Sequence, residues 1–446
     1  MSEADEVNPA DSQFPSVADR MREDWNARAR EDAYYYVAFG QRGQDDTEFY
    51  HSGADIVRSL EAELKRLQPA DHKSRRALEI GCGPGRLMLP MSWNFGEIHG
   101  VDISDEMISR ATWALHDIPN AFPRVTRGTD LKMFGDEMFD FIYSYAVFQH
   151  IPSAEVVFSY LAECRRVLKA QGILRCQING LPKTAKEYTT WEGARIGAGE
   201  MADFACMHDM QLLAIEGVDT QYFWLTMRKQ PAGWFESLAS NPPKETCRVR
   251  NIYNAQTGEA AVPASGRYAN IAIWIEDFPQ DADLNQINLL IEGKEAAPVY
   301  IGPPVSDGLT QVNVILPKHV RTGLVPVELQ RFGQTIAETA WMRVIPPGPV
   351  VPKIVRVTDG IDQVLEWRTK TRTVKLSFED LANPEFTAAT IDGFPVADLE
   401  TFCTNPVNSA HEVNFTLPSQ TRAGAHELEV SIGKRKFPAM TIEVLA

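Results

Sequence analysis

The sequence has few cysteines, fewer basic than acidic residues, and no long apolar run. Its six cysteines are scattered over 446 residues with no CxxC pair, so neither a zinc site nor a disulfide framework is predicted. The 44 Lys and Arg residues against 60 Asp and Glu residues give a formal net charge of −16. This balance argues against nucleic acid as a partner, because phosphate-binding surfaces need clustered cations. No stretch approaches the roughly 18 uninterrupted apolar residues of a membrane span.

The first residues, 1–7, are acidic and lack the apolar core of a signal peptide. Scattered cysteines are typical of free thiols in a reducing compartment. Together these features predict a cytoplasmic protein. The hydrophobic share of 44% is ordinary for a globular protein, so a sizeable core is expected.

Length and two proline-rich joints predict three domains. Roughly 150 residues per domain gives about three for this chain. The joints, at 241–244 and 346–349, suit extended connectors, because proline fixes φ and donates no backbone hydrogen bond. The predicted parts are an N-terminal helical lid segment (1–50), an α/β domain (51–230), a linker (231–249) and two β-sandwiches (250–346 and 347–446).

The N-terminal half alternates short apolar runs with stretches of helical spacing. Strands are predicted at 76–80, 98–102 and 139–144, a helix at 154–168, and later strands at 172–178 and 222–227. Strands that alternate with helices indicate βαβ units and a mostly parallel sheet.

The last 200 residues alternate apolar and polar positions, as half-buried strands do. They also repeat: Val312-Asn313 recurs as Val413-Asn414, and Leu316-Pro317 as Leu417-Pro418, each 101 residues further on. A tandem of all-β sandwiches resembling immunoglobulin-like modules is predicted. Neither module contains a cysteine pair that could form the inter-sheet disulfide of antibody domains.

The strongest chemical motif follows the first predicted strand, as Glu79-x-Gly81-x-Gly83-x-Gly85. Glycines there allow a tight turn and let a ligand lie against the main chain. The dinucleotide fingerprint would need its third glycine at position 86, which is arginine, and no Gly-Lys-Ser/Thr follows as in a P-loop. An acid beside the loop suits a ligand that carries ammonium and sulfonium charges.

Asp102 ends the next predicted strand. A carboxylate at this place can accept hydrogen bonds from a ribose diol. It could equally cap the helix that follows, although Ser104 fits that role better.

These motifs, followed by Phe139-Asp140 and by Arg166-Val167-Leu168-Lys169-x-x-Gly172, resemble class I S-adenosylmethionine-dependent methyltransferases over roughly residues 50 to 230. The resemblance implies a seven-stranded Rossmann-like sheet with an antiparallel last strand, and S-adenosylmethionine as cofactor. It places Glu79, Gly81 and Gly83 at the methionine end and Asp102 at the ribose. The cofactor-binding residues predicted are Glu79, Gly81, Cys82, Gly83, Gly85, Asp102, Ile103, Asp130, Leu131 and Tyr36.

The adenine position departs from the family pattern. Arg127 occupies the place where many relatives have Asp or Asn. Asp130, flanked by Thr129 and the Leu131 amide, is the predicted substitute.

Two catalytic candidates, Tyr145 and His150, lie in the loop after the predicted strand at 139–144, where open α/β sheets bind ligands. His150 could act as a general base or could pack to position the loop. An aromatic helical segment at 25–37 could form a lid that brings Tyr36 or Tyr50 to the methionine carboxylate, or could simply pack on the sheet. No metal site is predicted, since His208 near Cys206 supplies too few ligands.

Two functions remain open. The first is a methyltransferase acting on a hydroxyl or amine of a small metabolite, sugar or peptide, with β modules that dock, form a homodimer or select the acceptor. The second is a binding or scaffold protein that keeps the fold without turnover. The intact glycine motif with Asp102 favours the first.

Overall fold

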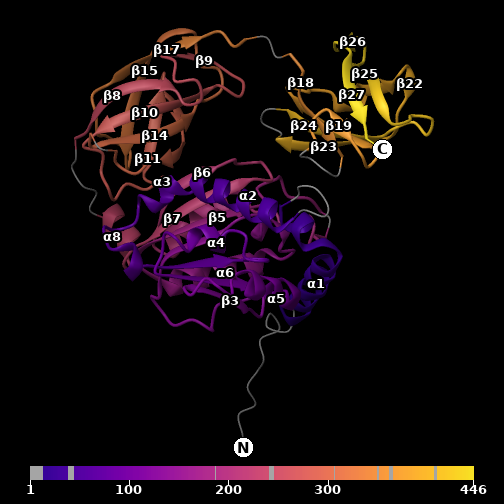
Figure 1. Cartoon of the computed structure of the whole chain (residues 1–446). Helices are drawn as coiled ribbons and strands as arrows, with labels where there is room; N and C mark the ends of the chain where they lie inside the picture. The colour runs from indigo at the N-terminus through magenta and orange to yellow at the C-terminus, as the bar shows by residue number, and fades with distance from the viewer. Residues whose placement is uncertain are drawn as a thin grey trace, which may run out of the picture. The chain divides into compact units, whose positions relative to one another are not determined.

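The computed structural model describes residues 14–38, 45–185, 187–240, 246–305, 307–348, 351–360, 365–405 and 409–445. The acidic residues 1–7 and the joint at 241–244 lie outside these ranges, as does Pro349 of the second joint. Two compact units are present, one containing the described residues up to Arg30 together with 50–348, the other containing 31–49 and the residues beyond 348. The first unit holds the α/β region and the first β module; the second unit holds the second β module (Figure 1).

The described residues that precede the first β module form eight α-helices. They are α1 (Phe14–Ala38), α2 (Asp46–Ser59), α3 (Glu61–Leu64), α4 (Met88–Met91), α5 (Asp105–Ala114), α6 (Ala154–Val167), α7 (Ala198–Met207) and α8 (Trp234–Ser240). Helix α1 is interrupted at Asp32, whose φ of −166° and ψ of 89° are not helical. Helix α8 lies within the residues predicted as a linker.

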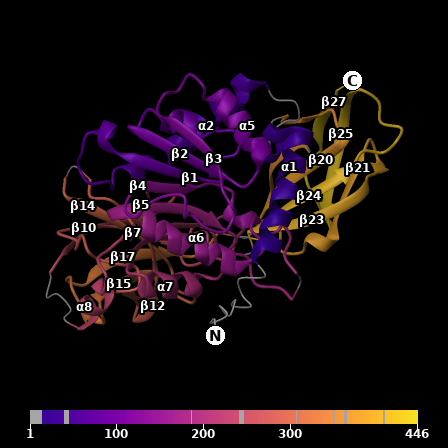
Figure 2. The ribbon, with the colours of Figure 1, turned by 90° about the horizontal axis from the view of Figure 1, so that it is seen from below.

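Seven strands of the α/β region belong to the sheet that carries the glycine motif. They are β1 (Arg76–Ile80), β2 (Glu97–Asp102), β3 (Ala121–Val125), β4 (Phe139–Ser144), β5 (Leu168–Ile178), β6 (Met210–Glu216) and β7 (Phe223–Lys229). Their order is β3-β2-β1-β4-β5-β7-β6. Figure 2 shows β1, β4, β5 and β7 following one another across the sheet. Strand β1 is parallel to β2 and β4, whereas β7 is antiparallel to β5 and β6.

The central strands are buried on both faces, which explains their continuous apolar sequences. One hydrophobic core joins the sheet to α6 and α7, and a second joins it to α2 and α4. Ser104 and Ser153 accept hydrogen bonds from Met107 N and Val156 N and so cap α5 and α6. The caps fix where the two helices begin, immediately after the loops that follow β2 and β4.

The sheet continues past β6 into the first β module. Tyr300 of β13 pairs antiparallel with Ala214 of β6, so one sheet of eleven described strands runs β3-β2-β1-β4-β5-β7-β6-β13-β14-β10-β8. Leu284 N donates to Leu212 O at 3.0 Å, and the Leu212 N–H donates to the buried Asp283 carboxylate. The first β module is therefore hydrogen-bonded to the α/β region at backbone level.

Each β module consists of two sheets with the same strand order. The first module contains β8 (Arg248–Asn254), β9 (Ala261–Pro263), β10 (Asn270–Glu276), β11 (Ile287–Ile291), β12 (Lys294–Ala296), β13 (Pro298–Ile301), β14 (Leu309–Ile315), β15 (Gly323–Arg331), β16 (Gln334–Thr335) and β17 (Ala340–Ile345). The second contains β18 (Lys353–Asp359), β19 (Arg368–Thr369), β20 (Thr373–Glu379), β21 (Thr387–Ile391), β22 (Phe394–Pro395), β23 (Ala397–Asn405), β24 (Ala410–Thr416), β25 (Gly424–Ile432), β26 (Arg435–Lys436) and β27 (Met440–Val444).

The sheets β13-β14-β10-β8 and β12-β11-β15-β17-β9 correspond strand by strand to β23-β24-β20-β18 and β22-β21-β25-β27-β19. The repeat predicted from the sequence is thus present as two copies of one β topology. All six cysteines are free. Across the described ranges, no helix is long and apolar enough to cross a membrane.

Candidate functional site

The glycine motif forms a loop whose backbone conformation favours glycine. Gly81, Gly83 and Gly85 have φ values of +71°, +52° and +87°, a region that side chains with a Cβ avoid. A Cβ at Gly81 would lie 2.3 Å from Val147 Cγ2. The N–H groups of Gly81 and Cys82 both donate to Val101 O, at 2.7 and 3.0 Å, which ties the start of the loop to β2.

Asp102 is held in place by backbone N–H groups on both sides. Its Oδ2 accepts from Gly83 N and its Oδ1 from Ser104 N, each at 2.9 Å. Burial raises the pKa of Asp102, while these hydrogen bonds lower it. Ser104 caps α5, as its position in the sequence suggested. The Asp102 carboxylate is therefore not the cap, and through its hydrogen bond from Gly83 it connects the glycine loop with the end of β2.

Glu79 lies directly beneath the loop and is almost fully buried. Tyr143 on β4 donates to Glu79 Oε2 at 2.8 Å, and Arg86 supplies the nearby positive charge. Burial nevertheless dominates and raises the pKa of Glu79 to about 8. In the ligand-free protein at neutral pH this carboxyl group is therefore protonated, and a cation bound beside it would favour its ionisation.

We expect the raised pKa of Glu79 to make the protein less stable as pH rises. The folded state holds the proton up to about pH 8, whereas the unfolded chain releases it near 4.5, so stability is lost between these values. The slope due to Glu79 is at most about 1.4 kcal/mol per pH unit. Denaturant unfolding of Glu79→Gln should show a shallower decline over pH 5–8.

Some decline should remain in that variant, because burial also raises the pKa of Asp283 to about 7. Glu97→Gln is the matched control. The hydrogen bond with His99 lowers the pKa of Glu97, so this carboxyl group contributes nothing to the loss of stability above pH 5. An identical pH dependence in wild type and Glu79→Gln would contradict the assignment.

The first part of α1, residues 14–30, packs against the site from the β2 side. Asn26 Oδ1 accepts from Ser104 Oγ at 2.6 Å and from Glu106 N at 3.3 Å. Arg22 donates to the carbonyl oxygens of Ile103 and Thr126, both at 3.4 Å. The predicted lid segment therefore reaches the residues that follow Asp102.

Helix α2 contacts the opposite side of the glycine loop. Tyr50 donates to Pro84 O at 2.9 Å, and Arg86 Nη1 donates to Ser52 Oγ at 3.2 Å. A Cβ at Gly53 would lie 2.4 Å from Arg86 O, so this glycine permits the close approach. The Tyr50 hydroxyl thus contacts the glycine loop through the backbone carbonyl of Pro84.

The predicted adenine residues lie on the loop after β3. Thr126 N donates to Asp102 O at 2.8 Å, which brings this loop next to the end of β2. Asp130 forms an ion pair with Lys132 at 3.6 Å, and Leu131 is fully buried with its N–H donated to Glu163. The Leu131 amide is thus engaged by α6.

Both ring nitrogens of His150 are engaged. Nδ1 lies 3.0 Å from Trp191 O and Nε2 lies 3.2 Å from the amide nitrogen of Gln149, an arrangement that fits the neutral tautomer with hydrogen on Nδ1. Gln149 in turn accepts from Gln177, whose Oε1 accepts from Ala146 N. Burial lowers the pKa of His150 to about 4. This chain of hydrogen bonds fixes the loop after β4.

The second catalytic candidate, Tyr145, is half-buried at the same end of the sheet. Its ring lies 5.7 Å from that of Trp224, and the Arg86 guanidinium lies 5.8 Å from its centroid. Tyr145 therefore borders the glycine loop through Arg86. Tyr36 belongs to the second unit, where its hydroxyl donates to Glu31 at 2.8 Å; its proposed contact with the cofactor stays a prediction.

Sequence reasoning missed Tyr143, Gln149, Gln177 and Asn26. Tyr143 could have been found, because β1 and β4 are adjacent parallel strands and their register places Tyr143 beside Glu79. The two glutamines and Asn26 carry no motif, since their partners are distant in sequence.

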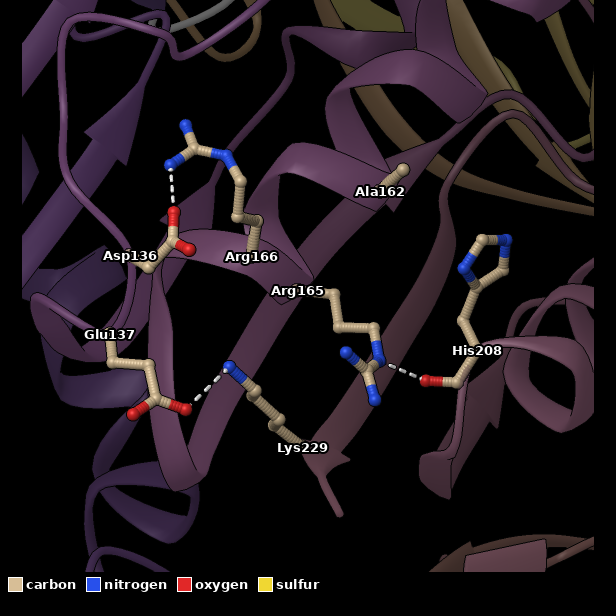
Figure 3. A pocket seen from close by; sticks show the side chains of 7 residues that line it. All are labelled: Asp136, Glu137, Ala162, Arg165, Arg166, His208 and Lys229. Atoms are coloured by element: carbon tan, nitrogen blue, oxygen red, sulfur yellow. Dashed lines mark hydrogen bonds and ion pairs between the residues drawn. The ribbon is translucent and has the colours of Figure 1, made fainter. Parts of the chain in front are cut away.

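A hollow of about 460 Å³ lies at the other edge of the sheet (Figure 3). Glu137 precedes β4 and Lys229 ends the antiparallel β7, so the hollow lies at the end of these strands that is opposite to the glycine loop. Its cations are engaged: Arg166 pairs with Asp136 at 2.6 Å and Lys229 with Glu137 at 3.2 Å. We assign no chemistry to it. The lining residues are Asp136, Glu137, Ala162, Arg165, Arg166, His208 and Lys229.

The region that carries this geometry has known counterparts. Residues 78–176 match the family model of a methyltransferase domain. The chain is 29% identical over 181 residues to the malonyl-(acyl-carrier protein) O-methyltransferase of Legionella pneumophila subsp. pneumophila, over 39% of this chain and 59% of that protein. It is 31% identical to a ubiquinone biosynthesis O-methyltransferase of Cereibacter sphaeroides, over 29% of this chain and 52% of that protein.

The chain thus spans between half and three-fifths of the length of these two relatives. Among solved structures, a SAM-dependent methyltransferase from Aquifex aeolicus aligns over 39% of this chain and 97% of its own, with 16% identity and a TM-score of 0.29.

Proposed function

We propose that this chain is an S-adenosylmethionine-dependent methyltransferase that transfers a methyl group by in-line displacement to an oxygen or nitrogen of an acceptor. The observation that carries the proposal is the Asp102 carboxylate, fixed by Gly83 N–H at the end of β2 beside a loop of three glycines with positive φ. The match of residues 78–176 to a methyltransferase domain supports the same conclusion.

The residues fit the cofactor chemically. A carboxylate has about four acceptor positions, and the backbone N–H groups of Gly83, Ser104 and Ile103 do not use all of those of Asp102, so it can also accept from a ribose diol. Glu79 is a buried acid that a neighbouring ammonium or sulfonium charge would ionise. Gly81, Gly83 and Gly85 present backbone without side chains. A phosphate-bearing dinucleotide would instead place its negative charge beside Glu79.

Bound S-adenosylmethionine supplies an electrophilic methyl group. The protein's part is to align the acceptor and exclude water. Trp25 and Arg28 of α1 cover the end of the sheet near His150: the Arg28 guanidinium lies 4.7 Å from the Trp25 ring and 5.5 Å from the Trp191 ring. Arg28 also donates to Thr190 Oγ1 at 3.0 Å, which joins α1 to the segment after β5.

We propose that His150 positions the loop after β4. Because its pKa is about 4 and both nitrogens are engaged, His150→Gln should lower kcat by less than about 100-fold and leave the shape of the pH profile unchanged. The measurement is kcat against pH between 5.5 and 9. A loss above about 10⁴-fold together with disappearance of an ionisation near pH 6.5 would instead identify a general base.

The acceptor is proposed to be a small metabolite, a sugar or a peptide. Both relatives named above are O-methyltransferases, which supports oxygen as the methylated atom. We further propose that residues 1–50 form the lid and that residues 51–230 are catalytic. We also propose that the two β modules are Ig-like and that they act in docking, homodimer formation or acceptor selection.

Formation of S-adenosylhomocysteine against a panel of hydroxylated and amino acceptors tests this function. The wild type should turn over at least one acceptor class, and Asp102→Asn should lose that activity. Tight binding of S-adenosylmethionine without turnover on any class would favour a scaffold that retains the fold.

A further inference from the structure

A small cavity lies where the α/β region meets the first β module. Its volume is about 20 Å³, enough for one water or one small monatomic ion. Arg66, Leu213 and Arg228 line it from the α/β region, and Gln280, Pro303 and Thr310 line it from the first β module. The pairing of β13 with β6 brings the two sides together.

The residues around this cavity carry an excess of buried positive charge. Arg66 pairs with Glu63 at 2.5 Å, and both side chains are at most 4% exposed. Arg228 has no carboxylate within ion-pair distance among the residues that the structure describes; it donates to Gln211 Oε1 and to Arg66 O, at 3.4 and 3.5 Å. Burial and the neighbouring Arg66 lower the pKa of Arg228. Two guanidinium groups thus face one carboxylate.

Three of the lining residues also hold polar atoms without a hydrogen-bond partner. They are Arg66 Nη2, Arg228 Nε and Thr310 Oγ1, all shielded from solvent, with no partner in the described part of the chain. A buried donor without a partner destabilises the folded protein, and more so when the donor is charged. Three unpartnered donors and one uncompensated positive charge around one cavity are the features of an anion-binding site.

We propose that this cavity binds one small monoanion, for which chloride has the matching size and charge, and that the ion joins the first β module to the α/β region. A water molecule could accept the hydrogen bonds but could not compensate the charge. Phosphate and sulfate are too large for the volume. The site is separate from the glycine loop and does not depend on the proposed methyl transfer.

Crystals of the full chain grown in bromide test the site directly. We expect an anomalous difference peak within hydrogen-bond distance of Arg66 and Arg228. No peak there, with ordinary water density instead, would overturn the proposal.

Thermal unfolding in sodium chloride and in sodium gluconate, at the same ionic strength, tests the coupling. The wild type should melt about 2 °C higher in chloride, because only the folded state holds the ion. Arg228→Met, which removes the excess charge, should lose this difference. Arg76→Met is the matched control, since Arg76 has its own carboxylate, Glu97, at 2.9 Å. A chloride effect of equal size in wild type and Arg228→Met would refute the site.

Discussion

Replacement of Asp102 by asparagine is expected to weaken S-adenosylmethionine binding about 100-fold. Each charge-assisted hydrogen bond to the ribose is worth about 1.5 kcal/mol or more, and two are lost. The new amide would also place an NH₂ group against either Gly83 N–H or Ser104 N–H, because both carboxylate oxygens now accept. The dissociation constant from calorimetric titration measures the effect.

Asp105→Asn is the matched control for this variant. Asp105 lies in the first turn of α5, three residues further on, and its side chain is 62% exposed. The affinity of the Asp105→Asn variant for S-adenosylmethionine should equal that of the wild type. Equal affinity in Asp102→Asn, in a protein that still unfolds cooperatively, would remove Asp102 from the binding site.

Gly81→Ala is expected to destabilise the fold by about 3 kcal/mol. The left-handed conformation at φ +71° costs about 1–2 kcal/mol for alanine, and overpacking against Val147 adds a similar amount. Denaturant unfolding measures the change. Gly199→Ala is the control, because a Cβ there meets nothing within 4 Å and the backbone is helical.

A double variant separates the two causes. Val147→Ala removes the methyl groups that a Cβ at Gly81 would meet at 2.3 and 2.5 Å, so it should recover most of the packing part of the loss, although the Val147 Cβ at 2.9 Å remains. The backbone part should remain. Strictly additive effects of the two substitutions would show that the contact with Val147 contributes nothing.

The sequence was sufficient to predict the tight turn at the glycine motif, the place of Asp102 at the end of a strand, and the repeat of the β modules. Each depends on local pattern: glycine where φ is positive, an acid at a strand end, and apolar alternation that recurs 101 residues later. The cap at Ser104 follows the same logic, because a cap is made within one helical turn.

The remaining features arise from contacts between distant segments. No local signal links Tyr300 to Ala214, yet their pairing extends the α/β sheet into the first β module. The engagement of both His150 nitrogens depends on Trp191, 41 residues away, so a histidine that looked available for proton transfer is occupied. The buried excess charge at Arg66 and Arg228 likewise exists only once helix α3, strand β7 and the first β module have come together.

Calorimetric titration of the full chain with S-adenosylmethionine tests the central claim most directly. The account predicts one binding site with a dissociation constant in the micromolar range, together with release of about one proton at pH 7 as the cation ionises Glu79, whose pKa is about 8. The proton count follows from repeating the titration in buffers of different ionisation enthalpy. Absence of binding at about 1 mM ligand, near the upper end of enzyme KM values, would contradict the account.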